Sequence, residues 1–170
     1  MKQFKTILAA FVLMVTLGLS NAQAQDKIAH IASQELIEAM PGYKKAMREL
    51  EQLEQTYKTD LQGMLKELET TYKGIQEKAQ TLSESQLEAE ALRFQEQEKK
   101  VEDYRRSAAE DVQNKRVELL KPVYEKARET VLRVAREKGF TYVLDSTTGT
   151  GVILADGYDL MADVKKALGI

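Results

Sequence analysis

The sequence predicts a mostly helical α+β protein in which a long antiparallel helical hairpin is inserted into a small β-containing oligomerisation body. Between Pro41 and Pro122 the chain contains no proline. Apolar residues in that stretch recur at steps of three and four, which is helical periodicity. Charged residues make up 31% of the chain and tryptophan is absent, a composition that suits long solvated helices. Short apolar runs typical of strands lie on both sides of the stretch.

Residues 1–24 are expected to be a cleaved export signal. Lys2 and Lys5 precede an apolar run from Ile7 to Leu19, and Ala22-Gln23-Ala24 supplies a cleavage site between small residues. We therefore expect the mature protein to begin at Gln25. A retained membrane anchor is the less favoured alternative, because the apolar run is short for a bilayer span.

The mature chain is acidic and has no cysteine. Removing Lys2 and Lys5 from the 25 basic residues leaves 23 against 27 acidic residues, a net charge of −4. This balance argues against a nucleic-acid partner, which needs a basic surface. The absence of cysteine excludes disulfides and thiol catalysis, and His30 is the one histidine. The sequence therefore predicts no enzyme, no catalytic residue, no metal, no cofactor and no small-molecule substrate.

The expected hairpin arm comprises residues 43–119, and the body comprises residues 25–42 and 120–170. At about 1.5 Å per residue, a helix of about forty residues extends about 60 Å, which is longer than a compact domain of this size needs. Because elements of the body precede and follow the arm, the two ends of the arm should meet at the body.

The body begins with a predicted strand at Lys27–Ala32 and a short helix at Ser33–Ala39. Ser33 is the expected N-cap of that helix. Pro41 should hold Met40 in an extended conformation, which would make a sharp start to the arm.

The tip of the hairpin is expected at Gln80–Ser85. Two capping boxes fit the start of the returning helix: Ser85 with Glu88, or Ser83 with Gln86. The sequence does not decide between them.

The returning helix has few apolar residues between Phe94 and Val112, so the distal part of the arm should be mobile. Gly63 and Gly74 on the outgoing helix could be tolerated without any role. The other interpretation is that they mark local softness, or the close approach of another helix. Pro122 should kink the returning helix or end it.

The C-terminal part of the body should begin after Gly139, a predicted C-cap. Strands are expected at Phe140–Asp145 and Val152–Ala155, paired as a hairpin. Asp159 should then cap a terminal helix over residues 160–168.

Such a body buries little surface and leaves sheet edges open. We therefore expect copies of the chain to complete one another's core. The candidate oligomer-core residues are apolar strand positions: Ile28, Tyr142, Val143, Leu144, Val152 and Leu154.

The export signal, the Lys-Ile-Ala-His-Ile strand, the long charged hairpin and the C-terminal motif Asp159-Leu160-Met161-Ala162-Asp163-Val164 together resemble the Skp/OmpH family of periplasmic chaperones. The resemblance covers the whole mature chain. It implies a homotrimer whose bodies form a small β-barrel that carries helical tentacles. It also implies a periplasmic protein, at most peripheral to the outer membrane, that holds unfolded outer-membrane β-barrel proteins between the tentacles without ATP.

The tip departs from the family's basic members, because residues 76–92 carry one Lys and four Glu. Contact with lipid or lipopolysaccharide through a basic tip is therefore not expected. Holding a client by apolar contact and enclosure does not depend on the sign of the charge. The candidate client-contact residues lie on the seam, the apolar face of each helix that should meet the other helix. For each of them, packing between the two helices of the arm is the stronger expectation. They are Leu61, Met64, Leu68, Tyr72, Ile75, Phe94, Val101 and Tyr104.

A structural coiled-coil envelope protein, acting as a spacer or an assembly module without holding clients, is the alternative. A spacer requires a continuous dry seam along both helices. The thin stretch from Phe94 to Val112, together with Gly63 and Gly74, favours a mobile clamp instead.

Overall fold

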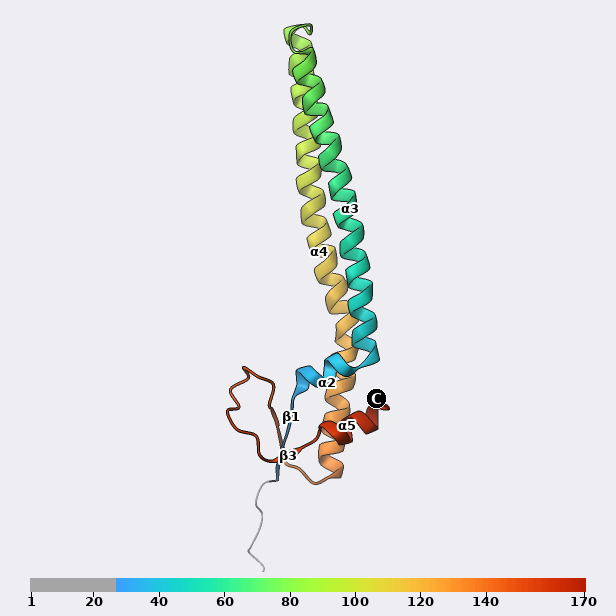
Figure 1. The fold of residues 1–170 in the computed structure, drawn as a ribbon, viewed down its shortest axis with the longest axis vertical. Coiled ribbons are helices and arrows are strands. Elements are labelled where there is room, and N and C mark those ends of the chain that lie inside the picture. The colour runs from blue at the N-terminus through green and yellow to red at the C-terminus, as the bar shows by residue number, and fades with distance from the viewer. Residues whose placement is uncertain (1–26) are drawn as a thin grey trace, which may run out of the picture. The chain divides into compact units, whose positions relative to one another are not determined.

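The computed structural model describes residues 27–170, so the predicted export signal lies outside the described residues. Most of the described chain is helical, as the sequence predicts, and two long helices account for most of its length (Figure 1). The elements follow in this order: β1 (Ile28–Ile31), α2 (Ser33–Ala39), α3 (Pro41–Lys78), α4 (Glu84–Glu137), β2 (Tyr142–Asp145), β3 (Tyr158–Asp159) and α5 (Met161–Leu168).

The described chain divides into two compact units. One contains residues 27–33 and 130–169, and includes the strands and α5. The other contains residues 34–129, and includes α2, α3 and most of α4.

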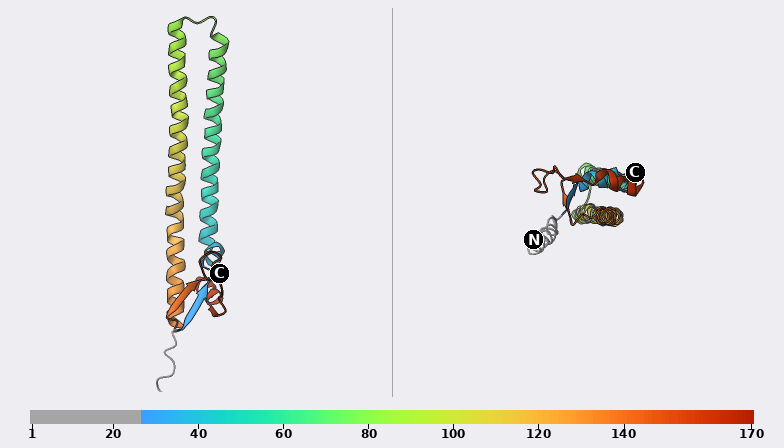
Figure 2. Two further views of the ribbon diagram at one scale, coloured as in Figure 1. Left: turned by 90° about the vertical axis from the view of Figure 1, so that its left-hand side faces the viewer. Right: turned by 90° about the horizontal axis from the view of Figure 1, so that it is seen from below.

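The second unit is dominated by the hairpin of α3 and α4, which run side by side in opposite directions (Figure 2). The 38 residues of α3 correspond to about 57 Å of helix. Met40 has φ −69° and ψ 132°, and Pro41 occupies the first turn. This is the extended residue before a helix-starting proline that the sequence predicts.

Helix α4 continues through Pro122 without a break, so of the two predicted outcomes, a kink or a helix end, the helix end is wrong. Proline removes one donor from the helix. The neighbouring Leu120 and Val123 are both buried, and this packing offsets the loss of one backbone hydrogen bond.

The tip uses the second of the two capping boxes. The Ser83 backbone N–H donates to Gln86 Oε1 at 2.9 Å, and the Gln86 N–H approaches Ser83 Oγ at 3.4 Å. This reciprocal pair places the N-cap one residue before the start of α4 at Glu84.

The first unit contains a three-stranded sheet in the order β2-β1-β3. Both neighbours pair with β1 in parallel, with Ile28 opposite Tyr142 and His30 opposite Leu144 and Asp159. The predicted strands at 27–32 and 140–145 are present in shortened form. The predicted antiparallel hairpin is wrong, because residues 152–155 form no strand in the described chain and β3 lies further on.

Hydrogen bonds after β2 explain why the chain does not fold straight back. The Thr150 hydroxyl donates to the backbone oxygens of Asp145 and Thr147, each at 2.7 Å. Gly149 and Gly151 adopt φ of 91° and 92°, a region that glycine reaches without strain. These contacts close a compact turn directly after β2.

Ser33 is the first residue of α2 rather than its N-cap, so that prediction is wrong. Its hydroxyl and its backbone N–H both donate to the Asp145 carboxylate. Thr147 donates to the same carboxylate through its N–H and its hydroxyl. Partial burial raises the pKa of Asp145, but these hydrogen bonds outweigh it and bring the pKa to about 2.

The predicted end of α4 is confirmed in detail. Gly139 has φ 76°. Its N–H donates to the backbone oxygen of Arg136, and the Phe140 N–H donates to the backbone oxygen of Ala135 at 2.9 Å. This is the Schellman arrangement. The Asp159 carboxylate accepts the Met161 N–H at 2.8 Å, which is the predicted contact, but α5 begins at Met161 and Leu160 occupies its N-cap position.

The apolar core of this unit includes one face of β1 and one face of α5. Leu160 and Val164 are fully buried, and Ala29 and Ile31 are nearly so. Alternation along β1 leaves Ile28 on the opposite face, where half of its surface is exposed.

We expect Asp145 to make stability depend on pH in the acid range. The fold lowers its pKa from 3.8 to about 2, so its contribution is complete above pH about 4 and is lost as the pH falls towards 2. At neutral pH, Asp145→Asn should destabilise the protein by about 1 kcal/mol, after allowance for solvent screening. Urea unfolding followed by circular dichroism should show this difference shrinking between pH 4 and 2.

Asp156→Asn removes another carboxylate from the same segment and is the control for the loss of one charge. A difference between wild type and Asp145→Asn that stays constant from pH 7 to pH 2 would contradict the assignment.

Candidate functional site

The hairpin of α3 and α4 is the candidate functional site, and its end near residues 42–50 has a dry seam. Ala46 and Leu50 on α3 are buried, as are Leu120, Val123 and Ala127 on α4. A Cβ on Gly42 would lie 3.3 Å from the Val123 side chain, so the chain passes close to α4 here. We call this part of the hairpin the proximal segment. It consists of α3 up to Tyr57 and of α4 from Asp111 onwards.

Beyond Tyr57 the outgoing seam is only half-buried. Leu61, Met64, Leu68 and Ile75 are of intermediate burial. Tyr72 is 50% exposed. The four aliphatic candidates therefore pack partly between the helices, while Tyr72 has a large free surface.

The three candidates on α4 contact α3 to different degrees. Val101 is only 7% exposed, so it offers little surface to a client while the helices are paired. The Phe94 ring lies 5.8 Å from that of Tyr72, in a tilted arrangement. The Tyr104 hydroxyl donates to Asp60 at 2.8 Å.

A polar cluster that the sequence pattern did not reveal lies in the middle of the hairpin. Tyr57 on α3 donates to Asp111 on α4 at 2.6 Å, and Tyr104 on α4 donates to Asp60 on α3 at 2.8 Å. The two tyrosine rings meet edge-on, with centroids 5.9 Å apart. We call these four residues the tyrosine–aspartate clasp. The stretch of α4 between Phe94 and Val112 that has few apolar residues thus contains polar contacts to α3 instead.

The clasp raises the pKa of both tyrosine hydroxyls. The hydrogen bond to Asp111 raises the pKa of Tyr57, with desolvation and nearby negative charge adding to it. Desolvation, followed by the hydrogen bond to Asp60, raises the pKa of Tyr104 to about 12. Each phenol is thereby held neutral as a donor to an ionised carboxylate.

Several apolar side chains outside the seam are exposed, and the sequence analysis did not select them. Val117 is 56% exposed and Tyr124 is 48% exposed. They border a surface groove of about 430 Å³ on α4, which Leu120 also lines. Seam periodicity selects side chains that face the other helix, so it passes over these residues. Others of this kind on the two helices are Met47, Leu65 and Leu92.

A second groove of about 390 Å³ lies near the tip, and Gly74, Ile75 and Leu82 help to line it. An added Cβ would meet no atom within 4 Å at either Gly63 or Gly74. Within the described chain, no helix therefore approaches these glycines closely, which excludes close approach and leaves a tolerated substitution or local softness as the two interpretations.

The candidate oligomer-core residues lie largely on one exposed apolar face. Ile28 is paired with Tyr142, and Leu144 lies two residues further along β2, so all three share a face of the sheet. Each is about half exposed. Val143 and Val152 are half-buried. In the following segment Leu154 is 75% exposed and its neighbour Ile153 is fully exposed.

Comparison with known proteins agrees with this arrangement. The family model for outer membrane proteins of the OmpH-like type matches residues 27–168. The chain belongs to the OmpH-like family. A crystal structure of a protein from Caulobacter crescentus CB15 that is described as OmpH-like matches with a TM-score of 0.73 and 20% identity over 86% of each chain. At this identity the likeness shows the fold. Comparison with curated protein sequences finds no match.

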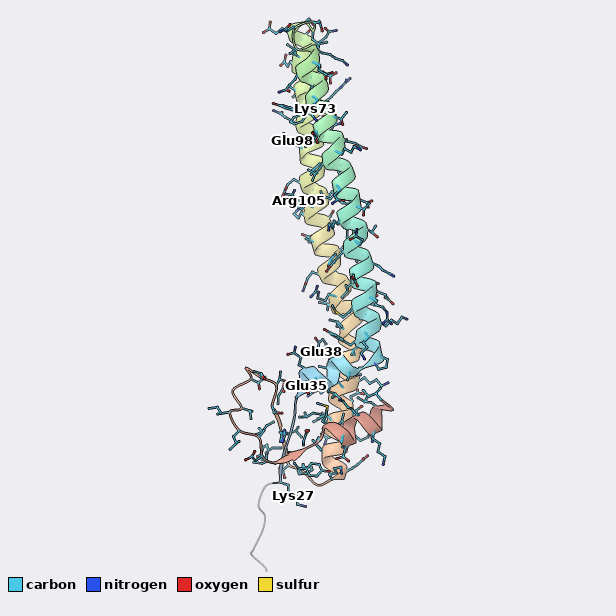
Figure 3. The ribbon with its side chains drawn as sticks, in the orientation of Figure 1. Lys27, Glu35, Glu38, Lys73, Glu98 and Arg105 are labelled. Atoms are coloured by element: carbon cyan, nitrogen blue, oxygen red, sulfur yellow. The ribbon has the colours of Figure 1, made fainter. Side chains whose placement is uncertain are left out.

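The hairpin of this OmpH-like chain carries a dense charged surface. Figure 3 shows side chains along its whole length, among them Lys73 on α3 and Glu98 and Arg105 on α4. Lys73 pairs with Glu69 on its own helix, and Arg105 pairs with Glu102. Exposed pairs of this kind contribute little to stability and keep the long helices soluble.

Other kinds of site find little support in residues 27–170. His30 Nδ1 lies 3.1 Å from Ser146 Oγ, while the nearby Asp145 carboxylate accepts from Ser33 and Thr147. No three potential metal-ligating side chains gather anywhere in this part of the chain. None of its helices has an apolar run long enough to cross a membrane.

The raised pKa of Tyr104 gives a test of the clasp. The fold stabilises the neutral phenol, so the contribution of this hydrogen bond is complete below pH 10 and is lost as the pH rises towards about 12. Spectrophotometric titration should show tyrosine ionisation at about pH 12, and the amplitude of this late step should fall by one tyrosine in Tyr104→Phe, where Tyr57, whose pKa is also raised, remains. Tyr72→Phe, which removes a half-exposed phenol, should leave the amplitude of the late step unchanged. A late step of unchanged amplitude in Tyr104→Phe would show that another tyrosine is responsible.

Proposed function

We propose that this OmpH-like protein is an ATP-independent periplasmic holdase that binds unfolded outer-membrane proteins between its helical arms. The observation that carries the proposal is the apolar surface spread along charged helices, from Val117 and Tyr124 on α4 to Tyr72 on α3. Helices satisfy their own backbone hydrogen bonds and offer no strand edge to a client. A barrel precursor, by contrast, exposes apolar strands with unpaired edges that associate readily in water.

Many weak apolar contacts suit this task better than one deep pocket. Fully burying an apolar side chain is worth about 1.5–3 kcal/mol, and a partly exposed one contributes less. A client could therefore exchange one contact for another without leaving the arms. The acidic tip does not oppose this mode of holding, because apolar contact is indifferent to the sign of the charge.

The same proposal includes a homotrimer formed through the body. The exposed face that carries Ile28, Tyr142 and Leu144 is apolar and unpartnered in the single chain. Ile153 and Leu154 are exposed in a segment that has strand-like sequence but no strand partner. Association of three copies would cover the face and give this segment a sheet edge.

We expect Leu144→Asp to dissociate the oligomer and destabilise the body. Leu144 is 46% exposed in the single chain, so the substitution costs little there. In an oligomer it places a charge in the interface at every copy. Sedimentation velocity should show the loss of the oligomer, and circular dichroism should show the accompanying loss of stability.

Ala162→Asp, which adds the same single negative charge at an exposed position on α5, is the control. A wild-type protein that is a folded monomer would contradict the proposal, as would a Leu144→Asp oligomer of unchanged stability.

The function itself is tested by shortening the hairpin. Residues 61–103 are replaced by the native tip, Ala79–Ser83, so that the buried residues of the proximal segment and both members of the Asp60–Tyr104 pair remain. This variant should stay a folded oligomer but should no longer keep an unfolded barrel soluble. Light scattering during dilution of the barrel from urea measures the protection without ATP.

A matched full-length variant, Glu77→Gln with Glu88→Gln, removes tip charges and should protect as well as wild type. If the shortened protein protects as well as the intact one, the arms do not hold the client. The protein would then be better described as a spacer or an assembly module.

A further inference from the structure

The tyrosine–aspartate clasp is reciprocal, because each helix contributes one donor and one acceptor. On α3 the residues are Tyr57 and Asp60, and on α4 they are Tyr104 and Asp111. A slide of either helix by one turn, about 5.4 Å, would break both hydrogen bonds at once. Arg116 on α4 also lies 3.4 Å from Glu54 on α3, so a further contact between the helices reinforces the same register.

The two sides of the clasp differ in packing. On the proximal side Leu50 and Leu120 belong to a dry seam. On the other side, in residues 61–78 with 84–103, Val101 is the one side chain among those described that is nearly buried. We call this part the distal segment. It also contains Gly63 and Gly74, which lower helix propensity.

An unsatisfied polar atom lies within the distal segment. Gln97 Oε1 is buried and accepts no hydrogen bond within the described chain. A buried acceptor without a partner destabilises the packed state. Separation of the helices would return this oxygen to water. Pairing of the distal segment therefore costs the free energy of burying an unsatisfied acceptor, and separation removes that cost.

We propose that the tyrosine–aspartate clasp is a stop that keeps the proximal segment paired while the helices of the distal segment separate beyond it. Separation exposes apolar seam residues such as Leu61, Leu68 and Val101, which the paired hairpin partly or almost wholly covers. The use of these residues by a client rests on the proposed function. The separation itself does not, and the experiment below measures separation alone.

The chain has no cysteine, so introduced cysteine pairs can be labelled uniquely. One pair, Lys66→Cys with Lys99→Cys, reports on the distal segment, and another, Gln52→Cys with Gln113→Cys, reports on the proximal segment. All four positions are exposed. Spin-label distance measurements, on labelled protein diluted with unlabelled protein, then give the separation of α3 and α4 within one chain.

In the otherwise wild-type protein we expect a narrow distance distribution for the proximal pair and a broad one with a long component for the distal pair. Tyr57→Phe with Tyr104→Phe keeps the aromatic contact and removes both hydroxyl donors. This double variant should give the proximal pair a long component as well. Hydrogen exchange of proximal amides should accelerate by at least about tenfold, because each lost bond to a charged acceptor is worth about that factor.

Tyr72→Phe removes a hydroxyl from the distal segment and should change neither distribution. Asp60→Asn with Asp111→Asn retains an oxygen acceptor and should fall between wild type and the double phenylalanine variant. A distal distribution as narrow as the proximal one in wild type would overturn the proposal. So would a proximal pair that is unaffected when both hydroxyls are removed.

Discussion

A pair of helices can bury only the stripe on each helix that faces the other, and this constraint governs the hairpin. Along most of α3 and α4 the seam is therefore half-buried rather than dry, and the remaining surface must be soluble. The chain meets that requirement with charge, much of it paired on the same helix, as in Lys73 with Glu69. Apolar residues such as Val117 and Tyr124 then remain exposed on an otherwise polar surface. The same limit on burial thus accounts both for the charged surface of the arm and for the apolar residues exposed on it.

The body faces a related limit. A sheet of three short strands has two faces, and the buried side chains of β1, Ala29 and Ile31, belong to only one of them. The other face presents Ile28 and Tyr142. In a chain without cysteine, no disulfide can compensate for the uncovered face. In the proposed homotrimer, neighbouring copies of the chain would cover this face on every subunit.

Sequence reasoning succeeded where structure depends on neighbours in the chain. Pro41 set the start of α3 and Gly139 set the end of α4, because each acts through local backbone geometry. It failed where the partner is distant. Ser33 has the right chemistry for an N-cap, but its hydroxyl donates to Asp145, 112 positions away. Residues 152–155 have strand-like sequence, but strand formation needs a partner that the single chain does not supply.

The candidate site shows the same division. Periodicity identified the side of each helix that faces the other, and it placed Tyr104 on that side. It could not show which residue on one helix lies opposite a given residue on the other, so Asp60 and Asp111 appeared to be ordinary surface charge. The exposed Val117 and Tyr124 were passed over for the opposite reason, because they lie away from the seam.

The clasp resolves an ambiguity that an apolar seam leaves open. On α3 the seam repeats at steps of eleven residues, through Leu53, Met64 and Ile75. Such a repeat favours nearly straight helices, and similar apolar residues at every step make several registers nearly equivalent. A tyrosine–aspartate exchange that occurs once along the hairpin is satisfied in one register alone. A polar pair among apolar contacts gives up some burial in return for this selectivity. The arm can therefore be loosely packed at its far end and still pair in a single register.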